Sequence, residues 1–100
     1  MRTKRAIDVM EEILGPPTFG GMLRGLRASR DMSQTNMAKF LGISKSSLCD
    51  IEKGRQFVSV ALAAKIAKKC QVPPTVAVKT ALNDQLRRAG LSFTVELEAS

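Results

Sequence analysis

Residues 33–54 read SQTNMAKFLGISKSSLCDIEKG, and the helical pattern of this stretch breaks at Gly42 and restarts almost at once. Apolar residues recur at helical spacing on both sides of the break, which predicts short helices at about 34–41 and 45–53. Gly42 can adopt the positive φ that a sharp turn needs, so the two helices should cross at a steep angle. One long helix would bury more surface, but this arrangement pushes the second helix outward as a ridge that the first helix braces.

The second helix of this pair has distinct inner and outer faces. Leu48 and Ile51 lie three residues apart and should face the core, which turns Ser46, Asp50 and Lys53 nearly the opposite way. A braced, projecting helix with hydrogen-bonding side chains on its outer face has the geometry needed to enter the major groove of DNA. The sequence therefore predicts double-stranded DNA as a partner.

Composition limits both the fold and the choice of partner. One hundred residues allow one domain, and 44% hydrophobic residues suffice for one core, which must be mainly aliphatic because the only aromatics are four Phe. The net charge of +7 suggests a polyanionic partner, either nucleic acid or an acidic membrane. A charged, solvated surface is the alternative explanation of the same surplus.

Residue types that support catalysis or metal binding are scarce. The chain has no His, and Cys49 and Cys70 stand far apart, which removes the usual zinc sites and any thiolate–His pair. Because a phosphate-binding Gly loop is also missing, we expect no enzyme activity, no metal and no cofactor. No stretch approaches the ~20 apolar residues of a membrane span, and acids interrupt the N-terminal region where a signal peptide needs an apolar run. We expect a soluble, cytoplasmic protein without a membrane partner.

Helical patterns flank the broken helix on both sides, so the expected fold class is all-α. Apolar spacing predicts an amphipathic helix at 3–14, in which Ile7, Met10, Ile13 and Leu14 form one face. Three further helices are expected: from Phe19 to about Arg30, after the capping residue Ser59, and from Pro74 to Gly90.

The C-terminal segment has the only strand signal in the chain. Residues 91–97 alternate apolar and polar side chains, with Leu91, Phe93, Val95 and Leu97 on one face. A single strand cannot satisfy its own backbone groups, so we expect it to pair with its copy in a homodimer as an antiparallel ribbon. A disordered acidic tail is the alternative.

Residues 32–54, MSQTNMAKFLGISKSSLCDIEKG, are preceded by LRGLRASRD, and together they resemble the helix-turn-helix of the lambda-repressor/Cro-like (Xre) family. The likeness covers Phe19 to Ala89 and implies a five-helix domain that binds operator DNA as a homodimer and regulates transcription. Size and layout are also similar to the antitoxins of type II toxin–antitoxin pairs, which implies a toxin protein as a further partner. The expected divisions are a helical extension at 1–17, the DNA-binding domain at 18–89 and a dimerisation strand at 90–100.

The resemblance also implies a set of DNA-binding residues. Gln34 matches a position that bonds a backbone phosphate, and Lys45 matches a base-reading position from which an ammonium can donate to guanine. The full set is Gln34, Ser44, Lys45, Ser46, Ser47, Asp50, Lys53, Arg55 and Gln56, of which the last three are expected phosphate clamps. The alternatives are ordinary solvated side chains and, for Asp50, a surface pair with Lys53.

Four other residues are interpreted without a direct role in DNA binding. Arg27 and Glu52 should meet at the edge of the core as an ion pair that braces the second short helix. Phe40 departs from the family pattern, and we expect it to pack on the N-terminal helix or on a second subunit. Cys49 lies on the flank of the second short helix, where an inert, half-buried thiol is favoured over a redox group.

The leading interpretation is a sequence-specific transcriptional repressor that acts as a homodimer on a palindromic operator. An antitoxin that regulates its own operon is compatible with it. The alternative is a protein-interaction module of the same fold, a toxin neutraliser or bridging factor, with little operator specificity. A membrane-surface protein fits poorly, because the basic residues are spread over a globular helical pattern instead of along one amphipathic face.

Overall fold

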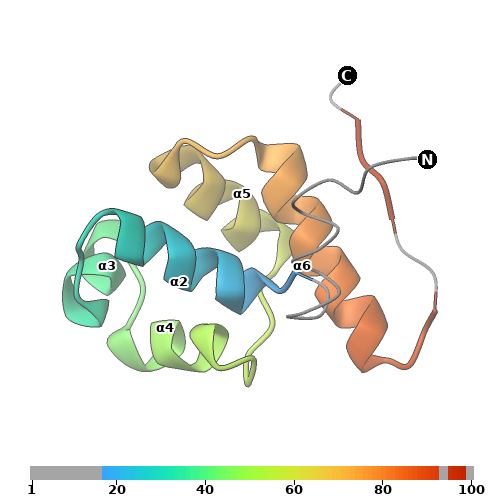
Figure 1. Ribbon diagram of the computed structural model, residues 1–100, viewed down its shortest axis with the longest axis horizontal. Coiled ribbons are helices and arrows are strands. Elements are labelled where there is room, and N and C mark those ends of the chain that lie inside the picture. The colour runs from blue at the N-terminus through green and yellow to red at the C-terminus, as the bar shows by residue number, and fades with distance from the viewer. Residues whose placement is uncertain (1–16, 93–94, 99–100) are drawn as a thin grey trace, which may run out of the picture.

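The computed structural model describes residues 17–92 and 95–98 of the chain. Within them lie five helices: α2 at Phe19–Ser29, α3 at Gln34–Leu41, α4 at Lys45–Glu52, α5 at Val60–Cys70 and α6 at Pro74–Arg88 (Figure 1). The predicted all-α class with five helices is confirmed, and α3 and α4 are the two short helices expected from the broken pattern. The helix predicted at 3–14 lies outside the described residues.

Hydroxyl side chains set where four of these helices begin. Thr18, Ser33, Ser44 and Ser59 are the N-caps of α2 to α5, and each accepts a hydrogen bond from the backbone N–H three residues later, at 3.0 or 3.1 Å. Such a bond satisfies one of the backbone donors that a helix start leaves unpaired. The helix α6 begins with Pro74 instead, whose fixed φ suits the first turn.

The turn between α3 and α4 depends on one glycine. Gly42 has φ 72° and ψ 34°, a left-handed conformation that ends α3, and its N–H bonds the carbonyls of Ala38 and Lys39. The next N–H, that of Ile43, also returns to the Ala38 carbonyl at 3.0 Å. These bonds satisfy the last carbonyls of α3 and start α4 at a new direction, as the sequence predicts.

A second glycine lets α2 approach the backbone of α4 directly. A Cβ atom built on Gly20 would lie 2.4 Å from the carbonyl oxygen of Ile51 and 2.8 Å from that of Glu52. Real Cβ atoms do not come so close to backbone atoms, so this position is restricted to glycine by packing. The C-terminal end of α4 therefore rests on the first turn of α2.

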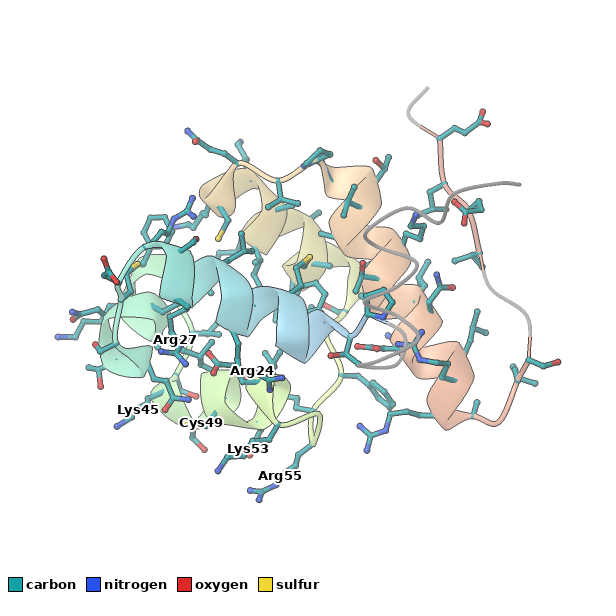
Figure 2. The ribbon with its side chains drawn as sticks, viewed as in Figure 1. Arg24, Arg27, Lys45, Cys49, Lys53 and Arg55 are labelled. Carbon is teal, nitrogen blue, oxygen red and sulfur yellow. The ribbon has the colours of Figure 1, made fainter. Side chains whose placement is uncertain are left out.

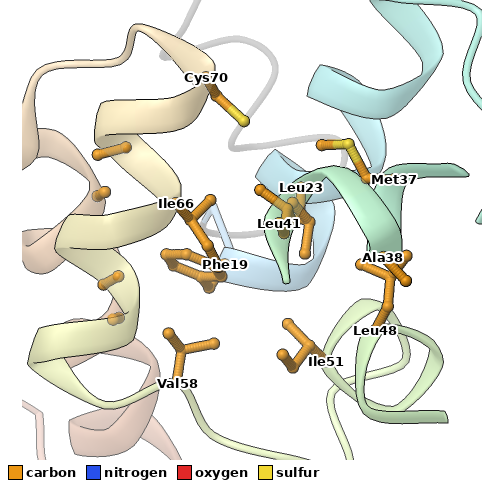
Figure 3. Close-up of a cluster of buried hydrophobic side chains, with 14 residues drawn as sticks. Phe19, Leu23, Met37, Ala38, Leu41, Leu48, Ile51, Val58, Ile66 and Cys70 are labelled. Carbon is orange, nitrogen blue, oxygen red and sulfur yellow. The ribbon is translucent and has the colours of Figure 1, made fainter. Parts of the chain in front are cut away.

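The core lies where α2, α3, α4 and α5 meet, and Ala77 and Ala81 of α6 also belong to it (Figure 3). Its largest fully buried side chains are Leu23, Met37, Leu41, Leu48, Ile51 and Ile66. The predicted inner faces are confirmed, because Leu48 and Ile51 of α4 face the core, as do Met37, Ala38 and Leu41 of α3. The core is mainly aliphatic, with Phe19 as the aromatic side chain in it.

The strand predicted for the tail is not supported by its described part, since residues 91–92 and 95–98 of the single chain have no regular secondary structure. Instead, the tail is bound by α6. The side-chain amide of Asn83 accepts from the Val95 N–H at 2.8 Å and donates to the Val95 carbonyl at 3.4 Å. Lys79, one turn earlier on α6, lies 3.5 Å from Glu96. A side-chain amide from the same chain thus supplies the backbone partner that the strand interpretation sought in a second copy.

Candidate nucleic-acid interface

Eight of the nine predicted DNA-binding residues lie on α4, at its start or in the loop after it, and the ninth, Gln34, begins α3. Six of the nine are exposed: Ser44, Lys45, Ser46, Lys53, Arg55 and Gln56. The other three, Gln34, Ser47 and Asp50, are half-buried. Figure 2 shows Lys45, Lys53 and Arg55 along one edge of the molecule, pointing away from the helices. The fold therefore brings the predicted set onto one face, with basic groups along its length.

Two of these side chains stand at the exposed start of α4. Lys45 and Ser46 occupy its first turn, directly after the capping residue Ser44. No side-chain hydrogen bond engages either of them within the described part of the chain. An ammonium and a hydroxyl at this end of a projecting helix can reach the edges of bases in a groove.

The C-terminal half of the face is held together by its own side chains. Ser47 Oγ donates to Gln56 Oε1 at 3.1 Å, and Arg55 Nη1 lies 3.9 Å from Asp50 Oδ1. The predicted alternative partner of Asp50 was Lys53, whereas the structure pairs it with Arg55. The side chain of Arg55 is 68% exposed and that of Asp50 is 40% exposed, so the pair contributes little stability and leaves the guanidinium available to a phosphate. The backbone N–H of Arg55 also bonds the Asp50 carbonyl at 2.8 Å, which fixes the loop.

Gln34, the predicted phosphate ligand at the start of α3, has both ends of its amide engaged. Its Nε2 donates to Glu52 Oε1 at 3.3 Å, and Cys49 Sγ donates to its Oε1 at 3.1 Å. The thiol of Cys49 is half-buried, as expected, and it helps to orient Gln34. In this structure Gln34 therefore links α3 to α4, a role that its position in the motif does not reveal.

Arg27 and Glu52 form the bracing ion pair that the sequence predicts. Arg27 Nε lies 2.9 Å from Glu52 Oε2 and Arg27 Nη2 lies 3.1 Å from Oε1, so the contact is bidentate. The hydrogen bond to the nearly buried Glu52 carboxylate raises the pKa of Arg27 above its usual value. Arg27 also donates to the Met32 carbonyl at 3.2 Å, which ties the end of α2 to the same brace.

Two further arginines hold the C-terminal end of α4, and sequence reasoning missed both. Arg24 of α2 donates to the Glu52 carbonyl, and Arg88 of α6 donates to the Gly54 carbonyl. Cations at a helix C-terminus are favourable because the last carbonyls carry partial negative charge. Arg24 lies one turn before Arg27 on the same helix, which is a signal that could have placed it. Arg88 lies 34 residues from its acceptor, and no local pattern connects them.

Other kinds of site are not formed by residues 17–92 and 95–98. No group of three or more His, Cys, Asp or Glu side chains there could hold a metal ion. Both cysteines are free thiols, and burial raises the pKa of Cys70. No helix in this part of the chain is long and apolar enough to cross a membrane.

Comparison with known proteins agrees with this geometry. Residues 18–78 match the family described as helix-turn-helix domain. The chain belongs to this helix-turn-helix family. It is 44% identical over 46 residues to an uncharacterised HTH-type transcriptional regulator of Methanocaldococcus jannaschii, covering 46% of this chain and 70% of the relative. It is also 40% identical over 49 residues to the ImmF control region 10 kDa protein of Bacillus phage phi105, covering 49% of this chain and 54% of that protein's length.

Two solved structures share the helix-turn-helix fold. One is the restriction-modification controller protein C.AhdI from Aeromonas hydrophila, with a TM-score of 0.53, 30% identity, and coverage of 60% of this chain and 89% of that one. The other is an HTH_3 family transcriptional regulator from Vibrio cholerae, with a TM-score of 0.53, 32% identity, and coverage of 68% of this chain and 37% of that one. The predicted membership among lambda-repressor-like regulators is confirmed by these likenesses.

Proposed function

We propose that this chain is a DNA-binding transcriptional regulator that inserts α4 into the major groove. The observation that carries the proposal is the division of α4 into two faces. Leu48 and Ile51 are fully buried in the core, while Lys45, Ser46 and Lys53 are exposed along the opposite side. A rigidly seated helix with an exposed polar face is what direct readout of base edges requires.

Within this proposal the residues of the face divide into two kinds. Lys45 and Ser46 read base edges, because they stand on the free first turn of α4 with no other side-chain partner in the described residues. Lys53, Arg55 and Gln56 bond phosphates at the far end of the face, where their contacts position the helix without reading sequence. Asp50 can accept from a cytosine amino group only by giving up its weak contact with Arg55.

Gln34 and Ser47 support the same reading face. The first N–H groups of α3 lie next to Gln34 and, like those of any helix start, favour an anion such as a phosphate. The Gln34 side chain then serves mainly to hold α3 against Glu52 and Cys49 of α4. Ser47 serves to hold Gln56, because its hydroxyl donates to that amide.

We further propose that the regulator is a repressor that acts as a homodimer on a palindromic operator. The support is indirect: the family likeness, and the printed names of a phage control-region relative and a restriction-modification controller protein. Since the described tail binds α6 of its own chain, the interface is better placed on α6 than on paired tails. The exposed side chains of Val76 on α6 and Leu97 in the tail offer apolar surface there.

The experiment that tests this function selects bound duplexes from a random DNA pool with the full chain. We expect the selected duplexes to share a related, two-fold symmetric sequence. The logarithm of the association constant should fall by about 0.9 per phosphate contact for each unit of log salt concentration. Failure to bind any duplex at ~50 mM salt, with the helices intact by circular dichroism, would refute the regulator. The remaining candidate would then be a protein-interaction module such as a toxin neutraliser, which the family fold also allows.

A further inference from the structure

A groove of about 390 Å³ lies beside the C-terminal end of α4, between the start of α2 and the last turns of α6. Phe19, Ile51 and Val58 line its inner side but are only 1–3% exposed. The accessible apolar surface of the groove therefore comes mainly from Phe57, which is 48% exposed. An exposed aromatic side chain at the wall of a recess is a surface that another element can cover.

The same groove has a surplus of positive charge. Four cationic side chains, Arg24, Lys53, Arg87 and Arg88, line it together with the carboxylates of Glu52 and Asp84. Arg87 is paired with Asp84 at 2.5 Å, but Arg24 and Arg88 donate to backbone carbonyls, which fixes their positions without offsetting their charge. Arg88 also lies 5.0 Å over the ring of Phe57, so positive charge and apolar surface are adjacent. A complementary occupant would combine acidic and apolar side chains.

The described chain enters at the rim of this groove. Thr18 and Phe19 line it, and the carbonyl of Pro17 accepts a hydrogen bond from Arg87 at 2.9 Å. The segment that precedes Pro17 is therefore joined to the described chain at the rim of the groove. The part of them nearest to Pro17, residues 7–14, combines apolar side chains at helical spacing with the acids Asp8, Glu11 and Glu12. Only Gly15 and Pro16 separate this segment from the rim.

We propose that residues 7–14 dock in this groove of their own chain as an acidic, amphipathic segment. Ile7, Met10, Ile13 and Leu14 would cover the exposed ring of Phe57, and the three acids would face the arginines and Lys53. The attachment at Pro17 gives the segment a high effective concentration at the groove, which favours it over a free peptide of the same chemistry. The segment lies immediately next to its binding site, so little chain has to be ordered between them.

Docking has a consequence for DNA binding, and this step rests on the proposed function. Lys53 belongs both to the groove and to the face that we assign to phosphate contact. Acids placed beside Lys53 and Arg24 reduce the positive potential at that end of α4, so the docked segment weakens nonspecific attraction to DNA. The N-terminal segment would then act as an internal competitor for the phosphate backbone.

Paramagnetic relaxation tests the docking without reference to DNA. A nitroxide is attached at Val9→Cys, off the apolar face, in a full chain that also carries Cys49→Ser and Cys70→Ala. We expect strong broadening of the amides of Gly54, Phe57 and Arg88. The amide of Lys68 should keep its intensity, because it lies near the end of α5 that contacts the C-terminal end of α2, whereas the groove lies at the start of α2.

Two other outcomes overturn the proposal. If the amide signals of Gly54, Phe57 and Arg88 are not broadened, the segment docks elsewhere or nowhere. A mixture of spin-labelled, unenriched chain with unlabelled, ¹⁵N-enriched chain reports contacts between copies. Broadening of the groove in that mixture, at the strength seen within one chain, assigns the groove to the segment of a second copy.

The consequence for DNA is tested with charge-matched variants of the full chain. Glu11→Gln with Glu12→Gln should tighten nonspecific duplex binding about two- to fivefold at low salt, the range expected for exposed ion pairs. The control, Glu96→Gln with Glu98→Gln, changes the net charge equally, but neither residue lines the groove and Glu96 lies 3.5 Å from Lys79, so it should have a smaller effect. Equal effects of both pairs would refute local competition at Lys53. Absence of any duplex binding would refute the proposed function, while the relaxation result still decides the docking.

Discussion

The two ends of α4 are built in opposite ways. Its C-terminal end is held by three arginines, one of which forms a bidentate ion pair with Glu52, and by the backbone of α2 at Gly20. Its N-terminal end is fixed by the Ser44 cap and carries Lys45 and Ser46 into solvent. The fixed end sets the direction of the helix, so the free end can change its side chains without loss of fold. The residues that stabilise α4 and those that we assign to DNA recognition therefore lie at opposite ends of a helix of eight residues.

The largest expected effect comes from the fixed end. Glu52→Gln leaves the Arg27 guanidinium without its carboxylate and should lower the free energy of unfolding by up to about 3 kcal/mol, since the Arg27 side chain, which is only 23% exposed, then lacks its charged partner. Urea denaturation followed by circular dichroism measures the change. The control Asp50→Asn removes an exposed carboxylate from the same helix and should cost much less. Equal costs would show that the two ends are not held differently.

A glycine pair sharpens the same comparison. Gly20→Ala should lower the free energy of unfolding by about 2 kcal/mol, because the new methyl group meets the Ile51 and Glu52 carbonyls and α4 must shift. Gly25→Ala, on the same helix with nothing within 4 Å, should instead raise it by about 0.5–1 kcal/mol through helix propensity. Thermal unfolding of both variants decides. Similar shifts in both would mean that α2 does not rest on α4.

At the free end the expected effect is on discrimination and not on stability. Lys45→Ala should reduce the preference for the selected operator over random DNA by about 1 kcal/mol, while the melting temperature stays unchanged. Arg55→Ala should weaken both kinds of DNA alike, because a phosphate contact carries no sequence information. Titrations of both variants against both duplexes provide the measurement. A uniform loss in Lys45→Ala would place the reading face elsewhere.

The smallest effect is a pH dependence that belongs to the core and not to α4. Burial raises the pKa of the Cys70 thiol, so the unfolded chain loses this proton first as the pH rises. The stability due to the neutral thiol is complete below the unfolded pKa of about 9 and declines above it, by less than ~1 kcal/mol at pH 9.5. Cys70→Ala should flatten that decline, whereas Cys49→Ser should leave it in place. Denaturation series at pH 7.5 and 9.5 measure the difference.

Local patterns were enough to predict the parts of the site that lie close together in sequence. Gly42, Leu48 and Ile51 follow from helical spacing, and the Arg27–Glu52 pair follows from the position of each residue at the edge of a helix face. Arg24 and Arg88 could not be found this way, because they bond backbone carbonyls 28 and 34 residues away. A backbone carbonyl cannot be recognised as a partner from the sequence because every residue has one, whereas a carboxylate partner is visible as Asp or Glu.

The tail shows a different limit of sequence reasoning. Its alternating side chains predict a strand in need of backbone partners, but they do not identify the partner. A helix supplies it through one amide, and no periodicity in α6 singles out Asn83 for that role. For the same reason Gly20 went unnoticed, since a close approach between two backbones depends on tertiary packing.

The contact between Asn83 and Val95 also determines which changes the tail can accept during evolution or in protein engineering. Asn83 bonds the N–H and the carbonyl of residue 95, and neither group depends on the identity of the side chain. Most substitutions at this position should keep both bonds, and proline, which lacks the N–H, is the exception. The segment can therefore drift in sequence while it stays attached, so that low similarity among relatives in this region would not imply that the attachment is lost.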